Sequence, residues 1–441
     1  MKFIMCSNCG EGAAILYHIM LEGNDVALWI KEKSYAQAWD GLLPKVKKPT
    51  PEKDDVVIFD FSGMGELADK FRKAGHHVLG GSAYSDKLEQ DRMFGLEAME
   101  AAGIKIPLTK EFDDFSIKLV QDFLKEYGGD GKRWVFKPSG TGPASSLTYV
   151  SEDDDDLMFW VEYVEKGFSK DVDSFVLQQF IEGVVVSTEV WGNGNKFVLG
   201  TLNHDLEVKK FMNHCLGPAT GCSGNVIWSE KDPRCRIATE GVLRMEAAAM
   251  REQFCGPLDL NVVANEQGIW ALEFCARFGF EGVTNLPLLI KDDVGKFFSD
   301  IAYGQGDNIE LNNGFASGVR LTIPPYPVEA DVKDAEKVTP NVGVPIRGLP
   351  ENPEEVLKHF HFYEVFDDGD GVLRHSPGTG VIACVRDLND DLEAAFDRPY
   401  ELLEDIVLPN KQYRTDLAEV LGEMHDEVVA QENTWTNGSS Q

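Results

Sequence analysis

The first 84 residues alternate short apolar strands with helical stretches, and this alternation constrains the fold more than any other feature. Strands are expected at residues 2–5, 26–30, 56–61 and 78–79, with a helix at residues 13–22. Such alternation is typical of a parallel sheet with helices on its faces. In these folds the loop after the first strand, here residues 7–12, often meets a ligand. We therefore predict an N-terminal parallel-sheet domain.

The rest of the chain predicts further domains, because 441 residues exceed what one hydrophobic core usually serves. Helices are expected at residues 85–103 and 237–254, and an acidic helix start at 151–156. Paired strands are expected at 175–180 and 184–191, and a second strand pair at 257–264 and 268–274. Asn193-Gly194 is a hairpin signal. From Gly318 onward short strands and turns predict a C-terminal domain, and we expect a disordered polar tail from Glu427.

Charge and cysteine content exclude several classes of protein. A formal net charge of −32 repels nucleic acid and anionic membranes. No run of about 18 apolar residues occurs, so we expect a cytoplasmic protein without a membrane partner. Eight scattered cysteines indicate reduced thiols. Cys6 and Cys9 form a C-x-x-C, but a zinc site normally needs a second pair and a redox site a thioredoxin-like context.

The segment ALEFCARFG, residues 271–279, places Glu273 on an apolar strand and Arg277 four positions later, where the strand gives way to a turn. A carboxylate there can hold Mg²⁺ against nucleotide phosphates, and a guanidinium can hold a second anion. The alternative is an ordinary strand carboxylate that forms a salt bridge with Arg277. Asp259 and Asn261 alternate on the preceding strand, so both point to one face and either can be the partner ligand.

A second segment, WVFKPSGTGPASS, carries Lys137 to the end of a strand and continues into a loop of glycine and serine. Backbone N–H groups of such a loop can cradle phosphates. The candidates are Gly140, Gly142, Ser145 and Ser146. The alternative for Lys137 is a solvated lysine at a strand end.

Taken in order, these motifs resemble the phosphoribosylamine–glycine ligase family, also called glycinamide ribonucleotide synthetases, of the ATP-grasp superfamily. LEFCARFGF here is similar to the family's LEFNARFGD, and His204-Asp205 with Lys209-Lys210 is similar to its QDHKR. Residues 217–224, GPATGCSG, resemble its GPNTGGMG and make the more specific match. Weaker matches occur at residues 343–349 and 412–417.

The resemblance implies an α/β and α+β multidomain fold. It implies a Rossmann-like domain at residues 1–84, an ATP-grasp domain at 85–317 with a small subdomain at about 107–190, a C-terminal mostly β domain at 318–426, and a polar tail at 427–441. It also implies an ATP- and Mg²⁺-dependent ligase that joins glycine to phosphoribosylamine through an acyl phosphate. Its partners are then small molecules, neither nucleic acid nor membrane.

The resemblance also suggests roles for residues. Nucleotide binding is implied for Lys137, Arg92, Lys209, Gln178, Gln179, Phe180 and Ile181, with Glu189 as a stand-in for the ribose contact. Substrate binding is implied for Gly217, Pro218, Thr220, Gly221, Asp205 and Arg277, and metal binding for Glu273, Asp259 and Asn261. Arg277 and Lys137 are the candidate catalytic residues. Several of these roles have an alternative. Arg92 can be an exposed arginine on a helix, and Glu189 can be a strand carboxylate that points outward. The glycines of residues 217–224 can belong to an ordinary flexible loop.

Several positions depart from the family pattern. Ser145 replaces a second loop lysine, Cys275 replaces an asparagine, and Val184 replaces an acidic residue. The loop at residues 8–13 and the segment at 279–282 also differ from the family's GGREHA and GDPE. Two alternatives therefore remain beside the synthetase: a ligase for a different amine or amino acid, and a non-catalytic nucleotide-binding protein.

Overall fold

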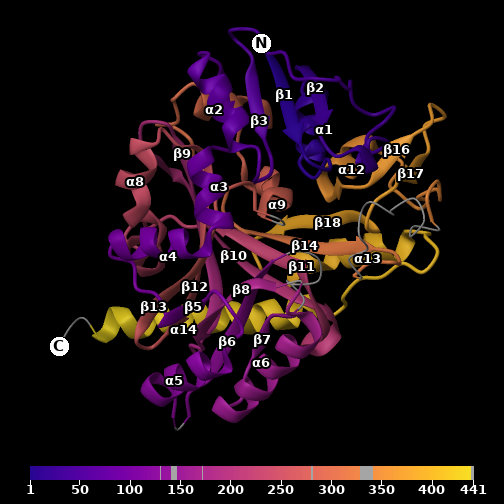
Figure 1. The fold of residues 1–441 in the computed structure, drawn as a ribbon. Helices are drawn as coiled ribbons and strands as arrows, with labels where there is room; N and C mark the ends of the chain where they lie inside the picture. Colours follow the sequence, from indigo (N-terminus) through magenta and orange to yellow (C-terminus); the bar gives the residue numbers. More distant parts are fainter. Residues whose placement is uncertain (130, 141–146, 171, 280–281, 328–340, 439–441) are drawn as a thin grey trace.

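The computed structural model describes residues 1–129, 131–140, 147–170, 172–279, 282–327 and 341–438 (Figure 1). The described strands form one parallel sheet, two antiparallel sheets and a short two-stranded ribbon. Helices and strands are both substantial, so the predicted α/β and α+β fold class is confirmed. How these elements divide into domains stays a prediction.

The N-terminal parallel sheet has the strand order β2-β1-β3-β4 and lies at the top of Figure 1. Its elements are β1 (Lys2–Ser7), α1 (Ala13–Leu21), β2 (Asp25–Ile30), the 3-10 turn η1 (Lys33–Tyr35), β3 (Val56–Phe59), α2 (Gly65–Lys73) and β4 (His77–Leu79). The strands are short and apolar, and every residue of β3 is buried, as expected for a strand covered on both faces. The predicted alternation is confirmed.

A small antiparallel sheet, ordered β5-β8-β6-β7, lies with α5 and α6 at the bottom of Figure 1. Its elements are β5 (Thr109–Phe112), α5 (Ile117–Tyr127), β6 (Trp134–Gly140), β7 (Tyr149–Val150), α6 (Asp154–Phe168) and β8 (Val172–Gln179). It has a separate aromatic core, in which the Phe112 and Phe175 rings stack 5.0 Å apart.

The large antiparallel sheet contains eight strands in the order β13-β12-β9-β10-β11-β14-β18-β15. The strands are β9 (Val184–Asn193), β10 (Phe197–Met212), β11 (Leu216–Ser229), β12 (Cys255–Asn265), β13 (Gly268–Cys275), β14 (Phe315–Thr322), β15 (Phe360–Phe362) and β18 (Val381–Asn389). The predicted β12–β13 strand pair and the hairpin at Asn193-Gly194 are confirmed. The predicted pairing of β8 with β9 is wrong, because they belong to different sheets.

Two predicted helices are interrupted. Residues 85–103 form α3 (Ala83–Gln90) and α4 (Arg92–Ala101), because the Asp91 carboxylate accepts a hydrogen bond from the Phe94 amide (3.0 Å) and begins a new helix. Residues 237–254 form α7 (Arg236–Glu240), η4 (Val242–Met245) and α8 (Glu246–Arg251), since Gly241 has a non-helical backbone. Periodicity alone does not reveal either break.

The predicted disordered tail is wrong, because α14 (Leu417–Gly438) continues through it and crosses beneath the large sheet (Figure 1). Val428 and Trp435 are buried, and the Trp435 indole N–H donates to the Asn265 carbonyl oxygen (3.0 Å). Apolar residues at helical spacing therefore outweigh the polar composition of this segment.

The remaining elements complete the C-terminal half. They are η3 (Asn213–Cys215), α9 (Gly282–Leu289), α10 (Val294–Ala302), α12 (Pro353–His359), η6 (Ala394–Phe396), α13 (Asp397–Asp405) and the ribbon β16 (Val365–Asp367) with β17 (Leu373–His375). In the described part of the chain, no helix combines the length and the apolar character needed to cross a bilayer.

Candidate active site

A polar cavity of about 300 Å³ opens over one face of the large sheet, where β13, β12, β9 and β10 lie side by side. Two rows of directly paired residues cross these strands. The first row is Glu273, Asn261, Ser187 and Asp205; the second is Cys275, Asp259, Glu189 and Asn203. Because alternate residues of a strand face the same side, both rows point into the cavity.

Glu273 projects into the cavity and remains exposed there. Burial by the surrounding protein alone would raise the pKa of this carboxyl group. The positive charges of Lys137, Lys209 and Arg92 outweigh that effect and lower the pKa below its ordinary value. Glu273 is therefore an ionised carboxylate at the centre of a cluster of cations.

Lys137 and Arg92 come from different elements and meet beside Glu273. Arg92 is the first residue of α4, and its guanidinium donates to the Lys137 carbonyl oxygen (3.2 Å). Lys137 lies in the middle of β6, so the prediction that it ends a strand is wrong, because pairing with β8 continues to Gly140. Burial lowers the pKa of both side chains, and the charge of Glu273 opposes that shift in each case. The structure thus brings the predicted triphosphate residues to one place, and Arg92 is not an exposed helix residue.

Three buried carboxylates form the floor of the cavity: Glu189, Asp205 and Asp259. Burial raises the pKa of each, and their mutual charges add to the shift for Asp205 and Asp259. Glu189 accepts hydrogen bonds from the indole of Trp191 (2.8 Å) and from Asn203 (3.2 Å). Glu189 is buried in the acidic floor, so it is not an outward-facing strand carboxylate.

The floor fits a hard divalent cation. Asp259 Oδ1 is buried and has no hydrogen-bond partner among the described residues. Carboxylate and amide oxygens surround it, the donors that Mg²⁺ prefers, while the Cys275 thiol in the same lining is a poor ligand for such an ion. A cation bound here would relieve the crowding of negative charge that raises these pKa values.

Arg277 forms its ion pair with Glu89 of α3, not with Glu273 (Nε to Oε1, 3.2 Å). The alternative in which Glu273 merely forms a salt bridge with Arg277 is therefore wrong. Burial would lower the pKa of Arg277, but Cys275, Glu89 and Glu11 raise it above its ordinary value, so the group stays charged. Arg277 therefore supplies a permanent positive charge at the wall of the cavity.

The predicted adenine segment lies at the end of β8, in the small sheet. The Gln178 side chain is buried and donates to Thr109 Oγ1 (3.1 Å), and the Arg133 guanidinium lies 4.5 Å from the centre of the Phe180 ring. Gln179 ends β8 and Ile181 follows in the connection to β9. Gly140 ends β6, whereas Gly142, Ser145 and Ser146 lie outside the described residues.

The predicted substrate loop divides into two parts. Gly217 and Pro218 are exposed at the start of β11, whereas Thr220 and Gly221 line the cavity. The same two residues also line a second cavity of about 280 Å³. Its other described lining residues are Cys9, Gly10, Glu11, Tyr35, Ala219, Tyr326, Pro327, Tyr363, Glu364, Thr379 and Val381. The two cavities thus share one wall.

Several cavity residues were not predicted: Glu89, Ser187, Asn203 and Glu207. Two of them had a signal in the sequence. Along β10, polar residues recur at every second position from Asn203 to Lys209, which is the pattern of a polar strand face. Glu89 had no such signal, because α3 reaches the site only through the tertiary fold.

The loop after β1 is held by a buried aspartate, Asp60, whose Oδ2 accepts a hydrogen bond from the Gly12 amide (2.8 Å). Burial raises the pKa of Asp60 to about 7. In the unfolded chain this group titrates near about 3.9. The folded pKa is therefore the higher one, so stability present below pH about 4 is lost as pH rises toward 7.

We expect Asp60→Asn to remove this pH dependence. An amide oxygen can still accept from Gly12, and no buried charge forms. The free energy of unfolding of the variant should equal that of the unmodified protein near pH 4. At pH 8 it should be higher, by at most about 4 kcal/mol. Thermal unfolding at both pH values measures this. The control is Asp54→Asn, an exposed position nearby. If the variant shifted the midpoint of thermal unfolding equally at both pH values, titration of Asp60 would not explain the pH dependence.

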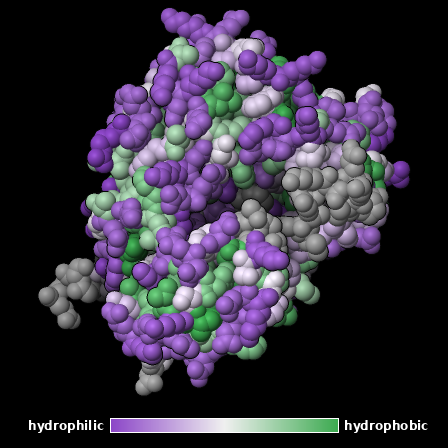
Figure 2. All heavy atoms as spheres, viewed as in Figure 1, coloured by the Kyte–Doolittle hydropathy of each residue, from purple (hydrophilic) through white to green (hydrophobic). Residues whose placement is uncertain are grey.

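Hydrophilic residues cover most of the face in Figure 2, which is hollowed near its centre. No family model matches the chain. Curated relatives are nevertheless similar over most of it. The chain is 25% identical over 360 residues to the phosphoribosylamine–glycine ligase of Streptomyces coelicolor, covering 80% of each chain. It is 24% identical over 383 residues to that of Corynebacterium ammoniagenes, covering 81% of this chain and 80% of the relative.

Solved structures share the fold. The crystal structure of phosphoribosylamine–glycine ligase from Thermotoga maritima superposes with a TM-score of 0.71 at 19% identity, covering 94% of this chain and 100% of that one. A second structure is the biotin carboxylase domain of Hydrogenobacter thermophilus 2-oxoglutarate carboxylase, solved with MgADP, ADP and bicarbonate. It superposes with a TM-score of 0.63 at 15% identity, covering 98% of this chain and 95% of that one.

The resemblance noted in the sequence motifs therefore extends over about 80% of the length of curated relatives, and the arrangement of the sheets is shared with a solved structure. The chain is therefore similar over about four fifths of its length to curated phosphoribosylamine–glycine ligases, and it shares the fold of a solved enzyme of that name.

Proposed function

We propose that the chain is an ATP-dependent carboxylate–amine ligase that joins glycine to phosphoribosylamine. One observation carries this proposal: Lys137, Arg92 and Lys209 surround Glu273 directly beside a floor of buried carboxylates. Cations suit a triphosphate, and the carboxylates suit the divalent ion that accompanies it. The relatives named above carry the same activity in their names.

The chemistry requires positioning and charge neutralisation more than covalent help from the protein. Glycine's carboxylate attacks the terminal phosphorus of ATP, and ADP leaves. The amine then attacks the acyl phosphate, and inorganic phosphate leaves as the C–N bond forms. Mg²⁺, when bound, neutralises charge on the phosphate oxygens during the first step. The protein's part is to hold both reactants in line and away from water.

The described residues offer a division of roles. Lys137 and Arg92 are proposed to hold the phosphates, and Glu273, Asp259 and Asn261 to hold the metal. Arg277, a permanent cation beside Thr220 and Gly221, is proposed to hold the carboxylate that becomes activated. The loop at residues 9–11 is proposed to receive the amine, because it lines the second cavity.

Release of ADP by the purified protein tests the proposal. The assay contains Mg-ATP and glycine, with and without phosphoribosylamine generated in the cuvette. Release that depends on both substrates supports the synthetase. Absence of release with every amine and amino acid tested would support the non-catalytic nucleotide-binding alternative and overturn the proposal.

A second candidate is a ligase for an amine without a phosphate. The described lining of the second cavity contains two carboxylates, Glu11 and Glu364, and neither lysine nor arginine. A sugar phosphate would normally meet such cations. In the same assay, ADP release with a phosphate-free amine and none with phosphoribosylamine would support this candidate.

The Cys275→Asn variant tests the metal site. Cys275 lies directly opposite Asp259 in the cavity floor, at the position where the family motif that the sequence resembles has an asparagine. An amide oxygen is a better ligand for Mg²⁺ than a thiol. We expect the Mg²⁺ concentration for half-maximal ADP release to fall about tenfold, the scale of one contact to a charged group. Cys215→Asn, at an exposed position, is the control. An unchanged Mg²⁺ requirement would mean that Asp259 and Asn261 already suffice.

A further inference from the structure

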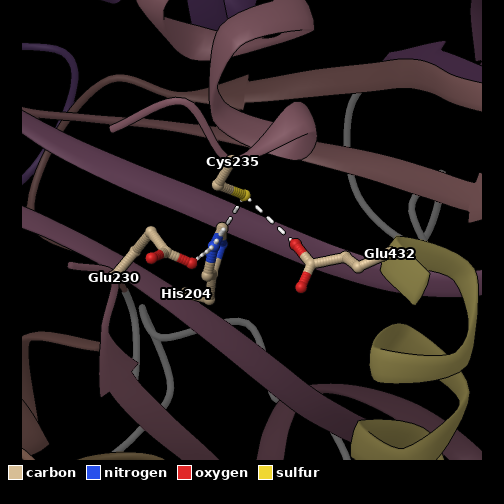
Figure 3. Close-up of side chains that lie close together, drawn as sticks. All are labelled: His204, Glu230, Cys235 and Glu432. Carbon is tan, nitrogen blue, oxygen red and sulfur yellow. Dashed lines mark hydrogen bonds and ion pairs between the residues drawn. The ribbon is translucent and has the colours of Figure 1, made fainter. Parts of the chain in front are cut away.

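Four side chains from distant parts of the chain gather behind the large sheet. They are His204 of β10, Glu230 just after β11, Cys235 just before α7, and Glu432 of α14 (Figure 3). One potential ligand atom of each lies within 4.8 Å of all the others. In the described part of the chain, no other group of three or more histidine, cysteine or acidic residues is gathered in this way.

Three of the separations between ligand atoms are close to those of a tetrahedral site. His204 Nε2 lies 3.4 Å from Glu230 Oε2 and 3.6 Å from Cys235 Sγ, and Cys235 Sγ lies 3.1 Å from Glu432 Oε1. Zinc bonds of about 2.0–2.3 Å at tetrahedral angles place neighbouring ligand atoms roughly 3.3–3.7 Å apart. The side chains point toward one common centre in Figure 3. Only small movements are needed to coordinate an ion.

The histidine is already oriented for this role. His204 is buried, and its Nδ1 lies 2.8 Å from the hydroxyl of Thr188 on the neighbouring strand. Such a bond to one ring nitrogen fixes the ring and directs the other nitrogen, Nε2, at the cluster. Metal-binding histidines usually have such an outer partner.

The cluster is separate from the ATP cavity. His204 and Asp205 are consecutive on β10, so their side chains point to opposite faces of the sheet. Asp205 lines the cavity, whereas His204 faces the side against which α14 packs, where the His425 ring contacts Trp228 (5.1 Å). A metal at one site therefore does not share ligands with the other.

We propose that His204, Glu230, Cys235 and Glu432 bind a zinc-class divalent transition metal. One nitrogen, one sulfur and two oxygen donors suit Zn²⁺ or Co²⁺ and not Mg²⁺. The Cys235 thiol gives up its proton to solvent as the S–metal bond forms. Four protein ligands leave no open position, which is the pattern of a structural ion. The ion would tie the C-terminal helix to the sheet, independently of the ligase reaction.

Metal content and cobalt spectroscopy test the site in the full-length protein. After removal of metals with a chelator, Zn²⁺ should rebind at about one ion per chain. Co²⁺ should give the intense visible bands of a tetrahedral ion and a thiolate-to-cobalt charge-transfer band. Cys235→Ser should abolish the charge-transfer band. Cys275→Ser should keep it, which separates this site from the thiol in the ATP cavity.

Two milder variants guard against misfolding. Glu432→Gln should lower Zn²⁺ affinity strongly, with Glu427→Gln on the exposed side of α14 as its matched control. Thr188→Val, which loses only the outer bond to His204, should weaken Zn²⁺ binding about 10–100-fold. Absence of a thiolate band in the unmodified protein, or a band that Cys235→Ser leaves intact, overturns the proposal. The cluster would then be hydrogen-bonded side chains only.

Discussion

Glu273→Gln is expected to lower kcat for ADP release by about 10²–10³-fold. The substitution keeps the size of the side chain and removes the charge that balances Lys137, Lys209 and Arg92. Without this carboxylate, the proposed metal site also loses a ligand. The pKa of Lys137 should also fall further, because burial lowers it and Glu273 is the charge that opposes the shift. Steady-state kinetics at saturating Mg-ATP measure the change.

Glu266→Gln is the matched control for Glu273→Gln, because Glu266 lies exposed in the turn of the same β12–β13 hairpin. It should leave kcat unchanged. Thermal unfolding checks that Glu273→Gln still folds. If a folded Glu273→Gln protein kept full turnover, Glu273 would not be a metal ligand. The assignment of this cavity as the site of Mg²⁺ and ATP would then be wrong.

Lys137→Met is expected to lower kcat/KM for ATP by about 10²-fold. The ammonium group lies beside Glu273 and Arg92, where a transferred phosphate would sit, and methionine retains only its apolar stem. Because the two residues influence each other's charge, Lys137→Met with Glu273→Gln should cost less than the sum of the single effects. ADP release against ATP concentration measures both.

Lys110→Met is the control for Lys137→Met. Lys110 is an exposed lysine on β5 of the same small sheet, so its replacement removes a charge without touching the cavity. It should leave kcat/KM unchanged. Equal losses in the two variants would point to a general effect of charge on this acidic protein and would contradict a specific contact from Lys137.

Sequence reasoning worked best where chemistry and strand periodicity coincide. Asp259 and Asn261 were predicted to share one face because strand side chains alternate, and the register of β12 with β13 places Glu273 beside them. Lys137 and Arg92 were chosen by motif, and the structure brings them to the same carboxylate. The N-terminal parallel sheet followed from the alternation of strands and helices in the first 84 residues, and the rest of the fold class followed from the family resemblance.

The errors arise where long-range packing decides the outcome. The β8 and β9 segments are neighbours in sequence, yet the chain crosses from the small sheet to the large one between them. The polar composition near the C-terminus concealed a helix whose burial depends on the large sheet against which it packs. His204 and Glu432 are more than two hundred positions apart in the sequence, so no local spacing rule joins them.

Thr220 and Gly221 form a wall that the two cavities share. In the proposed reaction, this wall affects how much ATP is hydrolysed for each amide formed. An acyl phosphate is prone to hydrolysis, and each molecule lost to water consumes a nucleotide without forming an amide. Because the reacting carbonyl and the incoming amine would face each other across a single strand edge, the activated group need not diffuse through solvent. If the proposed reaction takes place here, we expect this short segment of β11 to influence the ratio of ADP released to amide formed.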